Sequence, residues 1–230
     1  MHPNKPRILV IMPAYNEARV IYQTITELTD AGYEVVVVDD ASTDETGSEV
    51  KRTTARYLLH SINLGQGAAL MTGMVYAREK NYDYVIHFDA DGQHRVEDIP
   101  VMLALVLENK ADIVLGSRFM SLEGQGEIPR KRRILLKAAI WVNYLFTGIL
   151  LTDAHNGFRV LNRKAFTSIQ LRENGMTHAT EILTEIRRHH LRYCEVPVEI
   201  RYSEYARNKG QSAWNSLNIL SDLIVRKIFS

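Results

Sequence analysis

Five short apolar runs, rich in β-branched residues, recur through the first 117 residues and constrain the fold more than any other feature. They are RILVIM (7–12), YEVVVVD (33–39), RYLLH (56–60), YDYVIHF (82–88) and ADIVLGS (111–117). Each has the length of a strand and little polar alternation, which is typical of parallel strands buried on both faces. Between them, stretches such as 17–28 and 96–108 carry apolar residues at helical spacing. The alternation predicts an α/β layer, a mostly parallel sheet with flanking helices and right-handed crossovers.

The pattern changes after residue 117 to a more α+β character. Apolar residues at 134–151 predict a long helix, GFRVLN (157–162) and YCEVPVEIRY (193–202) predict strands with another helix between them, and a last helix is expected from about residue 212. The chain has 230 residues, 46% of them hydrophobic, and shows no internal repeat or long linker. We therefore expect one domain over residues 1–230.

Charge and cysteine content exclude several classes of protein. The chain has 28 Lys and Arg against 27 Asp and Glu, a net charge of +1, so nothing global suggests binding to nucleic acid. The single cysteine, Cys194, excludes an intrachain disulfide and a cysteine-based zinc cluster. The first apolar run, which follows Arg7, is too short for the core of a secretory signal, so we expect a cytoplasmic protein.

Polar residues gather where each predicted strand ends. The five strand ends read PAYNE (13–17), DDASTDET (39–46), NLGQG (63–67), DADGQH (89–94) and GSRF (116–119). In an open parallel sheet, ligands bind beyond the carboxyl ends of the strands. This edge is therefore the expected site.

Asp89 and Asp91 raise a question of charge. Residues i and i+2 of an extended chain point to the same side, so the two carboxylates converge and repel each other unless a positive charge lies between them. A hard cation with oxygen ligands, Mg²⁺ or Mn²⁺, would bridge them to substrate phosphates. The alternative is that the two aspartates only form a turn and cap the next helix.

The sequence lacks two common nucleotide-binding motifs. Gly65 and Gly67 precede a helix, but Leu70 takes the place of the third glycine of a dinucleotide fingerprint, and the segment follows the third strand instead of the first. No Walker-type phosphate loop occurs. Gly65 and Gly67 therefore form a tight strand-to-helix turn or lie beside a different nucleotide.

In this order and spacing, VIMPAYNE, VVVVDDASTDET, NLGQGAALMTG, HFDADGQH and GSRF resemble the nucleotide-sugar domain of inverting glycosyltransferase family 2, which has the Rossmann-like GT-A fold. TDAHNGFRVLNRKAF, THATEILTEI and YCEVPVEI extend the resemblance to the dolichyl or polyprenyl phosphate mannosyltransferase and glucosyltransferase branch. The resemblance implies a UDP- or GDP-linked sugar donor. It assigns residues 1–117 to nucleotide-sugar binding and 118–230 to an α+β acceptor region.

The resemblance also implies roles for particular residues. Asp89, Asp91 and Gln93 would hold Mg²⁺ or Mn²⁺, with Asp91 counted as catalytic and His94 as a less certain ligand. The nucleotide would be contacted by strand-end residues, which are Pro13, Ala14, Tyr15, Glu17, Asp39, Asp40, Gly67 and Asp89. Because Asp39 and Asp40 are adjacent, only one is expected to face the site, and Asp44 is the expected cap of the next helix.

The acceptor determines whether a base is needed. A polyprenyl phosphate oxygen is already ionised at pH 7, whereas a glycan hydroxyl must lose a proton to a carboxylate, for which Asp153 and Glu181 are candidates. Guanidinium and ammonium groups suit phosphate oxygens. The candidate phosphate or acceptor contacts are Arg118, Arg132, Arg133, Arg159, Arg201 and Lys209.

The apolar stretch at 134–151 bears on the membrane. It is interrupted by Lys137 and Asn143 and follows the basic run 130–133, which favours a helix lying in the membrane interface over one that spans it. A buried or dimer-forming helix is the alternative. We therefore expect a peripheral protein at the inner face of the membrane, with a membrane-protein partner as its anchor. Two other functions fit the sequence: elongation of a glycan hydroxyl, and a non-catalytic nucleotide-sugar-binding partner of a membrane complex.

Overall fold

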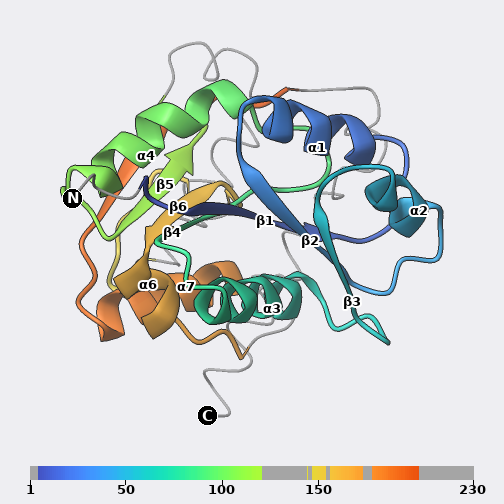
Figure 1. Ribbon diagram of the computed structural model, residues 1–230. Helices are drawn as coiled ribbons and strands as arrows, with labels where there is room; N and C mark the ends of the chain where they lie inside the picture. Colours follow the sequence, from blue (N-terminus) through green and yellow to red (C-terminus); the bar gives the residue numbers. More distant parts are fainter. Residues whose placement is uncertain (1–4, 121–143, 145–146, 154–155, 173–177, 202–230) are drawn as a thin grey trace, which may run out of the picture.

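The computed structural model describes residues 5–120, 144, 147–153, 156–172 and 178–201, and these residues build one seven-stranded sheet (Figure 1). The strand order is β3-β2-β1-β4-β6-β5-β7. The strands are β1 (Ile8–Ala14), β2 (Glu34–Asp39), β3 (Arg56–Leu59), β4 (Tyr84–His87), β5 (Ile113–Ser117), β6 (Arg159–Asn162) and β7 (Tyr193–Pro197). The five runs of the first 117 residues are thus confirmed as strands.

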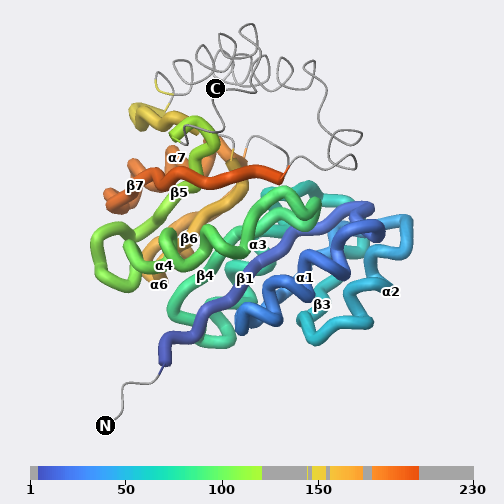
Figure 2. The backbone as a smooth tube through the Cα atoms, turned by 90° about the horizontal axis from the view of Figure 1, so that it is seen from above, coloured from blue at the N-terminus to red at the C-terminus, as the bar shows by residue number. Residues whose placement is uncertain are grey.

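Strand β6 is the one antiparallel member of the sheet. It pairs with β4 on one side and with β5 on the other, whereas β7 runs parallel to β5 at the sheet edge. Figure 2 shows β6 between β4 and β5. The expected mostly parallel sheet is confirmed, and a strand from the second half of the sequence lies within it. Because β6 runs in the opposite direction, its first residue, Arg159, lies beside the last residue of β4, His87.

Helices cover both faces of the sheet (Figure 1). α1 and α4 lie on one face, and α3, α6 and α7 lie on the other. The helical elements are α1 (Ile21–Asp30), α2 (Thr46–Lys51), α3 (Gln66–Glu79), the 3₁₀ turn η1 (Val96–Asp98), α4 (Ile99–Leu107), α6 (Arg163–Ser168) and α7 (His178–Arg188).

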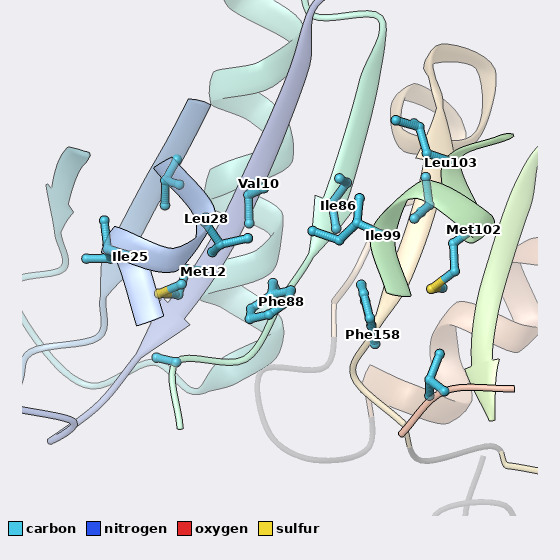
Figure 3. Close-up of a cluster of buried hydrophobic side chains, with 14 of the residues drawn as sticks. Val10, Met12, Ile25, Leu28, Ile86, Phe88, Ile99, Met102, Leu103 and Phe158 are labelled. Carbon is cyan, nitrogen blue, oxygen red and sulfur yellow. The ribbon is translucent and has the colours of Figure 1, made fainter. Parts of the chain in front are cut away.

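The two cores explain why the strand runs lack polar alternation. Along β1, Val10 and Met12 point into the core beneath α1 and α4, whereas Leu9 and Ile11 point into the core beneath α3. Figure 3 shows the first of these cores, where Phe88 packs edge to face against Phe158 at a centroid distance of 5.3 Å. Both faces of the strand are buried, so both sets of side chains must be apolar.

Two helices begin later than their apolar pattern suggests, and in both cases the extra residues form a turn. The Glu17 carbonyl accepts from the amides of Val20 and Ile21, so α1 begins at Ile21 instead of Glu17. Before α4, residues 96–98 form the turn η1, and Pro100 occupies the first helical turn, where its missing amide costs nothing. The first of these turns follows β1 closely, and η1 follows residues 88–95, which leave β4 at the edge where the site was expected.

Several predictions fall outside the described residues. These include most of the helix at 134–151, the last helix from residue 212, and the candidate contacts Arg132, Arg133 and Lys209. Across the part of the chain that the structure describes, no helix has the length and apolar character needed to cross a bilayer.

Candidate functional site

The carboxyl ends of β1, β2, β4 and β5 meet at one edge of the sheet, together with the start of the antiparallel strand β6. Pro13 and Ala14 are the last residues of β1, and Ala14 lies beside Asp39, the last residue of β2. All three are buried. The sequence prediction that the polar strand ends gather at a common edge is therefore correct.

The turns after β1 and β2 are joined by hydrogen bonds. The Asn16 amide donates to Ser42 Oγ over 2.9 Å, and the Asn16 side-chain oxygen accepts from the Thr43 amide over 2.8 Å. The Glu17 amide donates to Thr46 Oγ1 over 2.8 Å. Glu17 is itself buried, whereas Tyr15 is 45% exposed. These bonds fix the wall of the site on which Tyr15 presents its ring to solvent.

Asp44 was expected to be the N-cap of α2, but the N-cap is Glu45, and Asp44 lies one residue before it. Its Oδ1 accepts from the amide of Thr46, the first residue of the helix, over 3.0 Å. Its Oδ2 accepts from the Ala18 amide over 3.2 Å. Asp44 therefore links the start of α2 to the turn that precedes α1.

Asp39 is almost fully buried, and both of its carboxylate oxygens accept hydrogen bonds. Oδ1 accepts from the Ser42 amide over 2.8 Å, and Oδ2 accepts from the Tyr57 hydroxyl over 2.7 Å. Burial and the neighbouring Asp39 carboxylate raise the pKa of Tyr57, which keeps its hydroxyl protonated as the donor. Asp39 thus shapes the turn after β2.

Asp40 holds the turn that leads into α3. Its Oδ2 accepts from the Gly65 amide over 2.6 Å, and its Oδ1 accepts from the Leu64 amide over 2.9 Å and lies 2.7 Å from His60 Nδ1. Gly65 has a φ of 97°, a conformation that glycine adopts without strain. Asp39 and Asp40 therefore accept hydrogen bonds from different segments. Asp40 holds the start of α3, in which Gly67 is a buried residue.

Three residues fix the carboxylate of Asp89. Gln66 Nε2 donates to its Oδ1 over 2.9 Å, and His94 Nε2 lies 3.0 Å from its Oδ2. Gly157 packs against the same carboxylate so closely that a Cβ there would lie 2.8 Å from Oδ1 and 2.9 Å from Cγ. The Asp89 side chain still keeps 27% of its exposure, so its carboxylate is oriented but open to a ligand.

Asp91 is oriented by a residue on its own turn. The Gln93 amide donates to Asp91 Oδ1 over 3.0 Å, and Gln93 Nε2 donates to Asp91 Oδ2 over 2.7 Å. Asp89, Asp91 and Gln93 are thus brought together on the turn after β4. Over the described ranges, no cluster of three or more His, Cys, Asp or Glu side chains is arranged to hold a metal ion.

The two carboxylates differ in their pKa values. Burial, and after it the negative charge of Asp89, raise the pKa of Asp91 to about 6. Burial also acts to raise the pKa of Asp89, but the hydrogen bond from His94 and the charges of His94 and Arg159 outweigh it, so this pKa is lowered. At pH 7 a carboxyl with a pKa of about 6 is mostly ionised, so two negative charges lie close together on this turn. A cation shared with a diphosphate fits this donor set.

Arg159 is a buried cation beneath these acids. It is 2% exposed, and within the described residues its Nη1 atom has no hydrogen-bond partner. Burial lowers its pKa to about 10, whereas the charges of Asp89 and Asp153 act to raise it. Burial and, after it, the positive charge of Arg159 lower the pKa of the adjacent His87 to about 3, so His87 is neutral. Arg159 thus supplies the positive charge below the site.

Arg118 and Asp153 form a bidentate pair at the end of β5. Arg118 Nε donates to Asp153 Oδ2 over 2.7 Å, and Arg118 Nη2 donates to Oδ1 over 2.8 Å. The Arg118 amide adds a third bond to Oδ2 over 3.1 Å. The side chain of Asp153 is 2% exposed and that of Arg118 is 30% exposed. The Arg118 guanidinium is therefore the partly exposed member of the pair, and the buried Asp153 carboxylate fixes its orientation.

The remaining candidates lie in other contacts. Both carboxylate oxygens of Glu181 accept from the Arg172 amide, over 2.9 and 3.0 Å. Arg201 donates to Glu27 over 2.8 Å and to Glu97 over 3.4 Å. These contacts place Glu181 at the start of α7 and Arg201 beside the turn after Asp91, where its amide donates to the Gln93 carbonyl over 2.8 Å.

Sequence reasoning missed the residues that orient the acids. Gln66 and Gly157 contact Asp89 from segments 23 and 68 positions away along the chain, and His94 contacts it as an orienting partner. A signal existed for Gln66, which lies inside the glycine-containing strand end NLGQG. Gly157 gave only the signal of a glycine beside a predicted strand, which also marks an ordinary turn.

Comparison with known proteins finds both a family and close relatives. The model of the family described as "Glycosyl transferase family 2" matches residues 9–169. The UDP-N-acetylglucosamine–dolichyl-phosphate N-acetylglucosaminyltransferase of Methanococcus voltae is 27% identical over 96% of this chain and 96% of its own length. The undecaprenyl-phosphate mannosyltransferase of Micrococcus luteus is 31% identical over 88% of this chain and 87% of its own length.

A solved structure has the same fold. It is glucosyl-3-phosphoglycerate synthase from Mycobacterium tuberculosis in complex with Mn²⁺, UDP and glucosyl-3-phosphoglycerate. It is 19% identical to this chain, with a TM-score of 0.66 over 96% of this chain and 80% of that one. At this identity the likeness concerns the fold alone.

Proposed function

Because this chain belongs to glycosyl transferase family 2, we propose that it moves a sugar from a UDP- or GDP-linked donor to polyprenyl phosphate, with inversion and with Mg²⁺ or Mn²⁺, at the cytoplasmic face of a membrane. The GT-A fold and the glycosyltransferase class follow from the family and the fold match. The donor base, the metal and the acceptor are the proposed parts.

One observation carries the proposal: Asp89 and Asp91 lie together after β4, and the charge of Asp89 helps to raise the pKa of Asp91. Such a pair is completed by a cation. Mg²⁺ is commonly bound through one or two carboxylates together with substrate phosphates, so a donor diphosphate can supply the other ligands. When bound, the cation would offset the charge that develops on the departing nucleoside diphosphate.

The nucleotide would lie along the wall formed by the ends of β1 and β2. Tyr15 offers an exposed ring, and the buried Glu17, Asp39 and Asp40 hold the surrounding turns. Pro13, Ala14 and Gly67 line the same edge. We assign these residues to the donor side, with Asp89 at its inner end.

The acceptor side favours an oxygen that is already ionised. Asp153 is buried and bound to Arg118 through both oxygens, and Glu181 accepts from the Arg172 amide, so both of the candidate bases already hold hydrogen-bond donors. A phosphate acceptor needs no base. Its oxygen would form a bond to the anomeric carbon as the bond from that carbon to the diphosphate oxygen breaks, and the nucleoside diphosphate leaves with the electron pair.

Positively charged groups would hold that phosphate. Arg118 has a partly exposed guanidinium at the end of β5, and Arg159 contributes a buried charge beneath it. Arg132, Arg133, Arg201 and Lys209 remain candidates for the same role. The two relatives named above, which carry dolichyl phosphate and undecaprenyl phosphate in their names, support a polyprenyl phosphate acceptor and hence a place at the membrane surface. A membrane-protein anchor remains a separate proposal.

Mass spectrometry of lipid products tests the proposal. Purified protein would be incubated with polyprenyl phosphate, Mn²⁺ or Mg²⁺ and a panel of UDP and GDP sugars, and the lipids would be extracted. We expect a glycosyl phospholipid that forms only with metal. The Asp91→Asn variant should form about 10²–10³-fold less of it, whereas Asp30→Asn, at an exposed position at the end of α1, should match the wild type.

Two other results would change the assignment. Metal-dependent release of UDP or GDP without a lipid product would indicate a hydroxyl acceptor. Binding of a nucleotide sugar without turnover under any condition would indicate the non-catalytic partner of a membrane complex.

A further inference from the structure

Glu195, in the edge strand β7, accepts four hydrogen bonds from one short turn. Both of its carboxylate oxygens accept from the Thr152 amide, over 2.9 and 2.8 Å. Its Oε1 also accepts from Thr152 Oγ1 over 2.9 Å and from the Asp153 amide over 3.1 Å. One carboxylate thus satisfies two successive backbone amides and a hydroxyl, which strongly restrains residues 152 and 153.

The restrained turn leads directly to the acceptor side. Asp153 holds Arg118 through two side-chain bonds and one backbone bond. Thr152 Oγ1 lies 2.6 Å from Oγ of Ser117, the residue before Arg118. In the sheet, Glu195 of β7 pairs with Leu115 of β5. The register of these two strands therefore fixes Glu195 relative to Ser117 and Arg118 at the end of β5.

We infer that Glu195 is a positioning residue for the transfer reaction, which acts through Asp153 to set the direction of the Arg118 guanidinium toward the acceptor phosphate. This inference rests on the proposed function. Glu195 touches no reacting atom. It fixes the backbone from which Asp153 extends, and Asp153 then fixes the plane of the guanidinium. A shift of about 1 Å in such a group costs up to about 10²-fold in rate.

The Glu195→Gln variant removes this restraint with little change in volume. A glutamine keeps one acceptor oxygen and turns an NH₂ group toward the Thr152 and Asp153 amides, which are also donors, so part of the network is lost. We expect kcat/KM for polyprenyl phosphate to fall about tenfold, mainly through a higher KM for the acceptor, because charge-assisted hydrogen bonds are among the stronger ones. KM for the nucleotide sugar should stay unchanged. Glu195→Asp should recover part of the loss.

Glu108→Gln is the matched control. Glu108 is an exposed acid that follows α4 and forms an ion pair with Lys110. This variant should keep both KM values. If Glu195→Gln also keeps the acceptor KM while the wild type is active, the inference is overturned and the proposed function stands.

A double-mutant cycle tests whether Glu195 acts through Arg118. In an Arg118→Ala background, Glu195→Gln should reduce kcat/KM for the acceptor by less than about twofold, because the group that it positions is gone. A further loss equal to that seen in the wild-type background would overturn the route through Arg118.

Amide hydrogen exchange gives a readout that does not depend on the acceptor. In Glu195→Gln, the amides of Thr152 and Asp153 should exchange faster, whereas those of β1 and β2 should not change. Unchanged exchange at residues 152 and 153 overturns the inference whatever the substrate is. A wild-type protein that forms no glycosyl lipid, together with faster exchange in the variant, would place the failure in the proposed function and not in the positioning contact.

Discussion

Two aspartates at opposite edges of the same sheet, Asp91 and Asp112, show how differently a carboxylate can be used. Asp91 follows β4 at the carboxyl edge, whereas Asp112 precedes β5 at the other edge. Asp112 accepts from the Arg192 amide over 2.9 Å and from Arg192 Nη2 over 3.0 Å, and it also accepts from Asn162 and Lys164. Asp91 accepts only from its neighbour Gln93 among the bonds described above.

The protonation of the two groups follows from these partners. Hydrogen bonds from Arg192 lower the pKa of Asp112, against the opposing effect of burial. Burial and the charge of Asp89 raise the pKa of Asp91 to about 6. Asp112 therefore has several donors within the fold, whereas Asp91 has two donors from Gln93, and we propose that a bound cation completes its environment. A carboxylate with a raised pKa in a polar strand-end turn is a candidate for a functional role, whereas one that accepts bonds from several donors of the fold is a candidate for a structural role.

The largest effect should follow from Asp91→Asn. This change removes a negative charge that the donor site needs, so we expect transfer activity to fall by about 10²–10³-fold. The melting temperature should stay the same or rise, because repulsion with Asp89 is relieved. Product formation and a thermal melt of the same preparation would check both. Full activity would mean that Asp91 is not part of the transfer site.

A smaller loss is expected from Gly157→Ala, which sharpens the comparison without changing any charge. A Cβ at position 157 would press on the Asp89 carboxylate and displace it. We expect activity to fall by about 10–100-fold, with weaker Mn²⁺ binding in a titration.

Gly32→Ala is the control for that variant. Gly32 has a φ of 86° with open space around its Cα, so alanine there costs about 1–2 kcal/mol of stability through backbone strain alone. It should lower the melting temperature and leave activity unchanged. Equal activity in Gly157→Ala and Gly32→Ala would show that the close packing on Asp89 is not needed.

Asp112→Asn should have the opposite profile to Asp91→Asn. It weakens bonds to Arg192 and Lys164, and we expect the free energy of unfolding to fall by about 1–3 kcal/mol. Transfer activity below the melting range should not change. Urea unfolding alongside Asp30→Asn, which should match the wild type within about 0.5 kcal/mol, provides the measurement. A stable but inactive Asp112→Asn protein would contradict the division between the two edges.

The sequence predicted the strands and the edge at which the site lies, since both depend on local patterns. Runs such as 33–39 are apolar on both faces because helices cover both faces, and the polar residues that follow each strand gather because parallel strands end together. Asp89 and Asp91 were picked out from their spacing of two in an extended chain, but they lie on the turn that follows the last residue of β4, His87.

The contacts made across long stretches of sequence could not be predicted. Nothing local places β6 between β4 and β5, and that placement brings Gly157 against Asp89 and Arg159 beside His87. Similarly, the pairing of Asp153 with Arg118 joins residues 35 positions apart. Periodicity reports which face a residue occupies, but it does not report which distant segment packs on that face.

The smallest expected effect is a pH dependence of the stability that Asp112 contributes. Because the folded-state pKa of Asp112 is lowered, its contribution to stability is fully present above the unfolded pKa of about 4 and is lost as the pH falls toward the folded value. The stability difference between the wild type and Asp112→Asn should therefore be constant from pH 7 to about pH 5 and should shrink below about pH 4. Urea unfolding at pH 7, 5, 4 and 3 measures it. A difference that stays constant down to pH 3 would mean that Asp112 contributes through packing and neutral hydrogen bonds, so that its charge is not what distinguishes it from Asp91.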